Sequence, residues 1–322
     1  MFEADSITAD RKNRRALSFW RIIAILALMI AFVALLVNNT QTSTRLAKYS
    51  EHVARVRIDG LITGDQKTIA LLEKIQKASS VKAVIVRINS PGGTTVGSEA
   101  VYEAIRKIAK NKPVVAVMDS VAASGGYIAA LASDHIVARG NTITGSIGVI
   151  FQWPEVHQLL GKIGVEMKTI KSGPQKAEPN MYAPLKDEVR PVLEEMVSDS
   201  FDWFVGLVSE RRKLSTKIVY KLADGRVYSG RQALKNNLID AVGGEEVAIE
   251  WLIKEKKIGK SLKITDWKGP TTSDKVGLSL SIFSDFFNAV GLEAVARNLQ
   301  GTFGGSQQRL DGLLAVWQPA IK

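Results

Sequence analysis

The chain has 322 residues, 46% hydrophobic and 23% charged, which is enough apolar material for one sizeable core and excludes disorder as its overall state. It has no cysteine, so disulfides, thiol catalysis and cysteine-ligated metal sites are excluded. The formal net charge is +11. The basic residues are spread along the chain, and five of them cluster before or at an apolar run. We therefore attribute the charge to membrane topology and solvated surface rather than to nucleic-acid binding.

That apolar run comes first in the chain. Residues 22–37, with their apolar flanks, approach the ~20 residues that cross a bilayer core. Basic residues precede the run and uncharged residues follow it, so the positive-inside rule places the N-terminus in the cytoplasm. A cleaved signal peptide is the alternative, but the run is longer than a typical signal-peptide core and no A-x-A site follows. We predict a basic cytoplasmic segment at 1–20, a single N-terminal transmembrane helix at 21–38 and a polar tether at 39–52.

Strand and helix patterns alternate from Val53 onward. Apolar and charged residues alternate in the first segment, as in a strand, and two almost continuously apolar segments follow at 83–88 and 114–118. Helical stretches at 66–79 and 95–110 separate these three segments. Apolar strands that alternate with helices predict an α/β fold whose parallel sheet is covered on both faces.

The second half of the chain is less regular. We expect a strand near 166–171, a loop and then a long helix from about 186 to 212. Beyond Gly269 the composition shifts to Ser, Gly and scattered aromatics. We therefore predict one globular domain at 53–262 and a C-terminal tail at 263–322. Contact with another subunit or with the membrane is the role we expect for this tail.

Two glycine-rich segments each follow a predicted buried strand. They are Asn89-Ser-Pro-Gly-Gly93 and Ala122-Ala-Ser-Gly-Gly-Tyr127. In parallel α/β folds, ligands bind at the carboxyl ends of strands, and glycines let a backbone N–H approach a substrate oxygen. With Ser124 as nucleophile, the two segments predict an oxyanion hole. The alternative is that both are tight turns and that Ser124 only caps a helix.

A serine nucleophile needs a base. His52, His135 and His157 lie in the tether, in a buried strand and at a polar helix start, where structural roles are the better interpretation. A lysine base needs a pKa lowered from ~10.4 to near 7, hence a dry pocket. Lys171 and Lys176 flank a loop in the second half of the domain, and the residues alone do not choose between them.

Five ordered motifs resemble one family, the short-form signal peptide peptidase A proteins of serine peptidase family S49, within the ClpP/crotonase superfamily. The resemblance covers about residues 53–250. Besides the two glycine-rich segments, it rests on Thr144-Gly-Ser-Ile-Gly-Val149, Ile170-Lys-Ser-Gly-Pro-Gln-Lys176 and Ala223-Asp-Gly-Arg-Val-Tyr228. It implies a repeated ββα spiral of the ClpP/crotonase type and serine endopeptidase activity.

The resemblance also assigns roles to residues. Ser124 takes the place of the nucleophile and Lys176 that of the base. Ser146 would orient the lysine, and the backbone N–H groups of Gly93 and Gly125 would form the oxyanion hole. No cofactor and no metal are implied.

The same resemblance implies peptide substrates, namely remnant signal peptides and misfolded exported proteins. It also implies homo-oligomers in which neighbouring subunits share the dyad, in the inner membrane, with the catalytic domain on the periplasmic or extracytoplasmic side. An acyl-CoA enzyme of the crotonase type and a catalytically silent scaffold or binding protein at the membrane are the alternatives.

Overall fold

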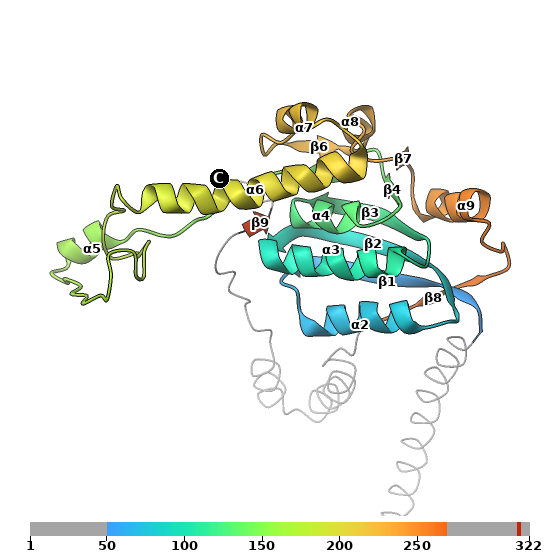
Figure 1. Ribbon diagram of the computed structural model, residues 1–322, viewed down its shortest axis with the longest axis horizontal. Coiled ribbons are helices and arrows are strands. Elements are labelled where there is room, and N and C mark those ends of the chain that lie inside the picture. The colour runs from blue at the N-terminus through green and yellow to red at the C-terminus, as the bar shows by residue number, and fades with distance from the viewer. Residues whose placement is uncertain (1–49, 269–313, 317–322) are drawn as a thin grey trace, which may run out of the picture.

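A mostly parallel sheet forms the centre of the molecule (Figure 1). The computed structural model describes residues 50–268 and 314–316. Within these ranges the elements are, in chain order, β1 (His52–Ile62), α2 (Gln66–Lys77), β2 (Val81–Thr94), α3 (Thr95–Ala109), β3 (Val114–Ala123), α4 (Gly125–Leu131), β4 (His135–Ala138), β5 (Ile143–Gly145), α5 (His157–Lys162), α6 (Arg190–Arg212), α7 (Thr216–Leu222), β6 (Val227–Ser229), α8 (Gly230–Lys235), β7 (Ala241–Val242), α9 (Glu245–Lys256), β8 (Lys263–Asp266) and β9 (Leu314–Val316).

The strands of the sheet follow the order β6-β5-β3-β2-β1-β8. Strand β4 pairs with both β3 and β7, and β9 pairs with β2. Only the β5–β6 and β2–β9 pairs are antiparallel among the described strands. The α/β class with a parallel sheet, predicted from the alternation of strands and helices, is therefore confirmed.

Both faces of the sheet are covered. On β2, Val84, Val86 and Ile88 point into the larger core, to which α2, α3, α4 and α6 contribute. Ala83 and Ile85, on the other face, pack in a smaller core with α9. A strand that is buried on both sides needs apolar residues at successive positions, which explains the continuous apolar run in this part of the sequence.

Several elements differ from the sequence-based expectation. β3 continues to Ala123, so the strand leads directly into the second glycine-rich segment. Residues 166–171 form no strand, and they belong to a projecting segment, residues 151–189, which we call the arm (Figure 1). His52, expected in the tether, is the first residue of β1. Strand β8 pairs with β1 beyond residue 262, where the predicted domain ended.

The predicted anchor cannot be compared with the structure. The segments at 1–20 and 21–38, and nearly all of the tether and the tail, lie outside the described residues. Within the part of the chain that the structure describes, no helix has the length and apolar character needed to cross a bilayer. The transmembrane helix therefore stays a prediction. The repeated ββα spiral also stays a prediction, because the strand order alone does not test it.

An ion pair between Arg212 and Asp240 joins α6 to the segment that follows α8. The Arg212 guanidinium donates to both carboxylate oxygens of Asp240, at 2.7 and 3.1 Å, and Asp240 also accepts the N–H of Ile136 at 2.7 Å. Arg212 is only 11% exposed. Asp240→Ala leaves the two terminal nitrogens of this guanidinium and one strand amide without this acceptor, while Arg212 Nε keeps its bond to Asn237 O. We therefore expect the substitution to lower the free energy of unfolding by about 2–4 kcal/mol. Urea denaturation measures this change.

This pair also predicts a dependence of stability on pH. Burial alone would raise the pKa of Asp240, but the bonds from Arg212 bring it below its ordinary value. The pair therefore stabilises the fold fully above about pH 4 and loses this contribution as the pH falls through the lower pKa of the folded state. In Asp240→Ala that part of the acid sensitivity should disappear. As a control, Glu250→Ala, which removes an exposed pair with Lys254, should change stability by less than about 0.5 kcal/mol; an equal loss in both variants would contradict the prediction.

Candidate active site

Ser124 lies in the sharp turn between β3 and α4. Its backbone has φ 53° and ψ −116°, a conformation that residues other than glycine seldom adopt. Ser124 occupies the N-cap position of α4, but its side chain makes no capping bond to the helix, so side-chain capping does not explain this serine. Its N–H donates to Gly145 O at 2.8 Å and its carbonyl accepts from Ile128 N at 2.9 Å. Two backbone hydrogen bonds thus fix the turn, and the Ser124 hydroxyl is not used to cap α4.

The two glycine-rich segments meet beside this turn, as the sequence predicted. Ser90 pairs with Ala122 across the β2–β3 ladder, and α4 packs against β2. A Cβ on Gly126 would lie 2.6 Å from Ser90 O, so only glycine permits this approach of the α4 backbone. Gly125 is the first residue of α4, and amides of a first helical turn have no acceptor within the helix.

Gly93 lies in the end of β2, where neighbouring backbones crowd it. A Cβ at this position would fall 1.8 Å from Ile62 O of β1. On its other side, residues 92–94 pair antiparallel with β9. The edge of β2 beside the Ser124 turn therefore accepts an extended backbone as a neighbouring strand. Ser124 itself is buried beside this edge, with 1% of its surface exposed in the single chain.

Ser146 lies close to Ser124 through Gly145. Gly145 O accepts the Ser124 N–H, and the next residue, Ser146, has φ 49°. The Ser146 N–H donates to Arg226 O at 2.8 Å, which ties this segment to the start of β6. The structure thus brings Ser124, Gly125 and Ser146 together, and it places Gly93 at the end of β2, the strand against which α4 packs.

Lys176 is the fifth predicted site residue, and it lies on the arm. Its side chain is exposed, and it is not among the residues that line the pocket beside Ser146. Figure 1 shows the chain between α5 and α6 projecting beyond the body that carries β3 and α4. Within one chain, then, the predicted base is not placed at the predicted nucleophile.

Lys171, the other candidate for the base, is held in an ion pair. Its ammonium donates a short hydrogen bond to Glu178, and this bond is the largest cause that lowers the pKa of Glu178 below its ordinary value. The Lys171 ammonium is therefore already bound to a carboxylate of the arm itself. Between the two lysines, the geometry favours Lys176.

The three histidines have structural contacts. His52 accepts a hydrogen bond from Trp267 Nε1 at 2.9 Å and stacks on that indole ring. His135 stacks on Trp251 at a ring-centroid distance of 4.7 Å, and burial lowers its pKa. His157 lies 2.9 Å from Glu155 on the arm. Nothing places a histidine beside Ser124 among the described residues, so the structure offers no Ser-His pair there.

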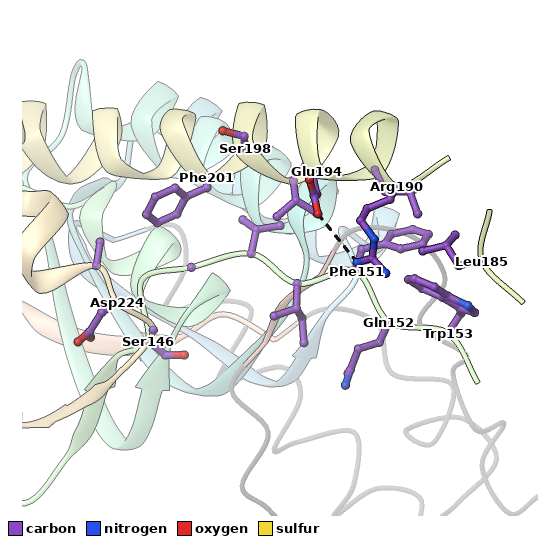
Figure 2. Close-up of a pocket in the computed structure, with 17 residues that line it drawn as sticks. Ser146, Phe151, Gln152, Trp153, Leu185, Arg190, Glu194, Ser198, Phe201 and Asp224 are labelled. Carbon is purple, nitrogen blue, oxygen red and sulfur yellow. Dashed lines mark ion pairs between the residues drawn. The ribbon is translucent and has the colours of Figure 1, made fainter. Parts of the chain in front are cut away.

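A pocket of about 750 Å³ extends from Ser146 beneath α6 (Figure 2). Apolar side chains dominate its lining, among them Phe151, Leu193 and Phe201, and Arg190 and Glu194 form an ion pair at one end. The sequence pattern did not predict this pocket, although two aromatic residues that follow the Thr144-Gly-Ser motif, Phe151 and Trp153, were a signal. Among the described residues, no cluster of His, Asp and Glu has the spacing of a metal site.

Comparisons with known proteins give two family matches and several similar proteins. The model of "Peptidase family S49" matches residues 106–259, and that of "Clp protease" matches residues 54–141. An Enterococcus faecium protein named "Putative signal peptide peptidase SppA" is 37% identical over 239 residues, which cover 68% of this chain and 69% of the relative. "Serine protease SPPA, chloroplastic" of Arabidopsis thaliana is 32% identical over 264 residues, 77% of this chain and 37% of the relative. Among solved structures, a point mutant of ClpP1 from Listeria monocytogenes aligns with a TM-score of 0.42 at 17% identity, over 63% of this chain and 96% of that one.

Proposed function

The chain belongs to peptidase family S49, and we propose that it is a serine endopeptidase of the signal peptide peptidase A type in which Ser124 is the nucleophile and Lys176 the base. The observation that carries this proposal is the strained turn at Ser124, which belongs to one of two glycine-rich segments that meet at the ends of neighbouring strands. Such strain persists only where the surrounding structure enforces it, and it is typical of functional sites.

The proposed mechanism uses only groups of this chain and water. Lys176, in its neutral form, accepts the proton of Ser124 Oγ as that oxygen attacks a peptide carbonyl. The N–H groups of Gly93 and Gly125 stabilise the oxyanion of the tetrahedral intermediate. The lysine ammonium then protonates the leaving amine, and a water molecule, deprotonated by the same lysine, hydrolyses the acyl-enzyme. Ser146 orients the lysine side chain.

The arm supports the further proposal that two copies of the chain share each site. Its exposed side chains include large apolar ones: Leu159 is 61% exposed and Ile163 is 65% exposed, and Val165, Met167 and Ile170 are also exposed. Apolar residues that one chain leaves uncovered are typical of an interface. A neighbouring copy would cover them, bring Lys176 to Ser124 and exclude water, which a neutral lysine needs.

The membrane anchor at 21–38 is proposed from the sequence, with residues 1–20 in the cytoplasm and the peptidase domain on the extracytoplasmic side of the inner membrane. A protease tethered there meets signal-peptide remnants and misfolded exported proteins, which we propose as substrates. The pairing of β9 with residues 92–94 supports binding of a substrate in extended form. A catalytically silent scaffold is the second candidate, because Lys176 lies apart from Ser124 in one chain.

A fluorophosphonate probe tests this function without knowledge of the substrate. Such probes react with serines activated by a base, so the full-length protein in detergent should be labelled, and peptide mapping by mass spectrometry should locate the adduct on Ser124. Labelling of Lys176→Ala should be at least about 100-fold slower. An unlabelled protein in an intact oligomer would favour the scaffold, and an adduct on another serine would overturn the proposed nucleophile.

A further inference from the structure

The turn between α7 and β6 holds Ser146 in its unusual conformation. Ser146 has φ 49°, which costs free energy for a residue with a side chain. Its N–H donates to Arg226 O at 2.8 Å. Some feature of the neighbouring turn must fix the direction of the Arg226 carbonyl, because otherwise the backbone of Ser146 could return to an unstrained conformation.

Asp224 supplies that feature. Its carboxylate accepts the backbone N–H of Arg226 at 3.1 Å and bonds Nε of the same residue at 2.7 and 2.8 Å. Bonding of an Asp side chain to the backbone two residues on is the Asx-turn, which fixes the intervening peptide units. Gly225 between them has φ +86°, a value that glycine adopts readily.

The strands on either side fix the ends of the turn. Gly145 pairs with Val227 in the β5–β6 ladder, and the hydroxyl of Tyr228 donates to Leu222 O at 3.0 Å. A Cβ on Gly145 would lie 2.6 Å from the Tyr228 ring, so the two segments are in close contact. From the turn, a chain of backbone bonds leads through Arg226 O and Ser146 to Gly145 O, and from there to the Ser124 N–H.

We propose that Asp224 is a positioning residue of the peptidase, which acts through the Arg226 carbonyl to hold Ser146, and with it the Ser124 turn, in the reactive geometry. Figure 2 shows Asp224 and Ser146 side by side at one end of the pocket beneath α6. The proposal rests on the proposed function, since it assigns Asp224 a part in that same site. Asp224 itself touches no reacting atom.

Two variants at this position separate positioning from charge. Asp224→Ala removes the Asx-turn and so lets Ser146 and the Ser124 turn shift. Because a small displacement of a catalytic group slows the chemical step, kcat for a fluorogenic peptide should fall about 10- to 100-fold while KM changes less than about twofold. Asp224→Asn keeps an oxygen for the Arg226 N–H and should retain at least about a third of the wild-type kcat. Because Asp224 and Arg226 are 43% and 63% exposed, their ion pair adds little stability, and the melting temperature of both variants should stay within about 3 °C of the wild type.

The control removes a carboxylate on another helix, Glu250 of α9, whose side chain is more exposed, at 64%, than that of Asp224. Glu250→Ala, which breaks the pair with Lys254 on α9, should leave kcat unchanged. The proposal is overturned if Asp224→Ala keeps the wild-type kcat, or if Asp224→Asn loses as much activity as Asp224→Ala. Labelling with the fluorophosphonate distinguishes failure of the proposed function from failure of the role of Asp224. If the probe does not modify Ser124 in the wild type, the proposed function fails. If the probe labels the wild type and Asp224→Ala equally, only the role of Asp224 is refuted.

Discussion

Replacement of Ser124 by alanine is expected to lower kcat by about 10⁴-fold or more and to leave the fold intact. The loss is large because no other group within the turn supplies an oxygen nucleophile, and removal of a serine nucleophile abolishes the covalent route altogether. Stability should change little because the Ser124 hydroxyl makes no capping bond and alanine is as strained at φ 53° as serine is.

The measurement compares kcat for a fluorogenic peptide, together with the melting temperature and the oligomer mass. Ser133→Ala provides a matched control, because Ser133 is also buried and lies just beyond the other end of α4. Among the described residues its hydroxyl donates to Ala130 O alone, so activity should stay within about twofold of the wild type. Retention of more than about 1% of the activity in Ser124→Ala would exclude this residue as the nucleophile.

Local chemistry made the surroundings of Ser124 predictable. An apolar strand followed by small residues and two glycines predicts a strand, a sharp turn and a helix, and the structure has β3, Ser124 and α4 in that order. The meeting of the two glycine-rich segments followed from the rule that parallel strands end at one edge of the sheet. Gly126 and Ser90 lie in contact there.

The arm was less predictable, for a physical reason. Val165 and Met167 alternate with polar residues, which is strand periodicity, yet the structure has no strand there and both side chains are exposed. An alternating pattern shows that one face of a segment will be covered, but not whether the same chain covers it. Strand β8 was missed because four residues are too few for a periodic signal, and the Asp224 turn because its role depends on a contact with Ser146, distant in sequence.

Lys176→Ala should lose about 10³- to 10⁴-fold in kcat, and part of the loss should be recovered when this variant is assembled with Ser124→Ala. Neither variant has a complete dyad of its own. If the arm of one copy delivers Lys176 to Ser124 of the next, a mixed oligomer contains sites with both wild-type residues. Random mixing in equal amounts gives about a quarter of the wild-type number of such sites, as in any ring with head-to-tail interfaces.

The test is to co-express the two variants with different affinity tags, purify the oligomers that carry both and measure peptide hydrolysis. Lys168→Ala serves as the control, since Lys168 is another exposed lysine of the arm, paired with Glu166, and should keep wild-type activity. Activity near a quarter of the wild type establishes a shared dyad. Background activity in mixed oligomers, while each variant alone is inactive, would instead place serine and lysine of one site in the same chain, and the arm would then have to fold back toward α4 on substrate binding.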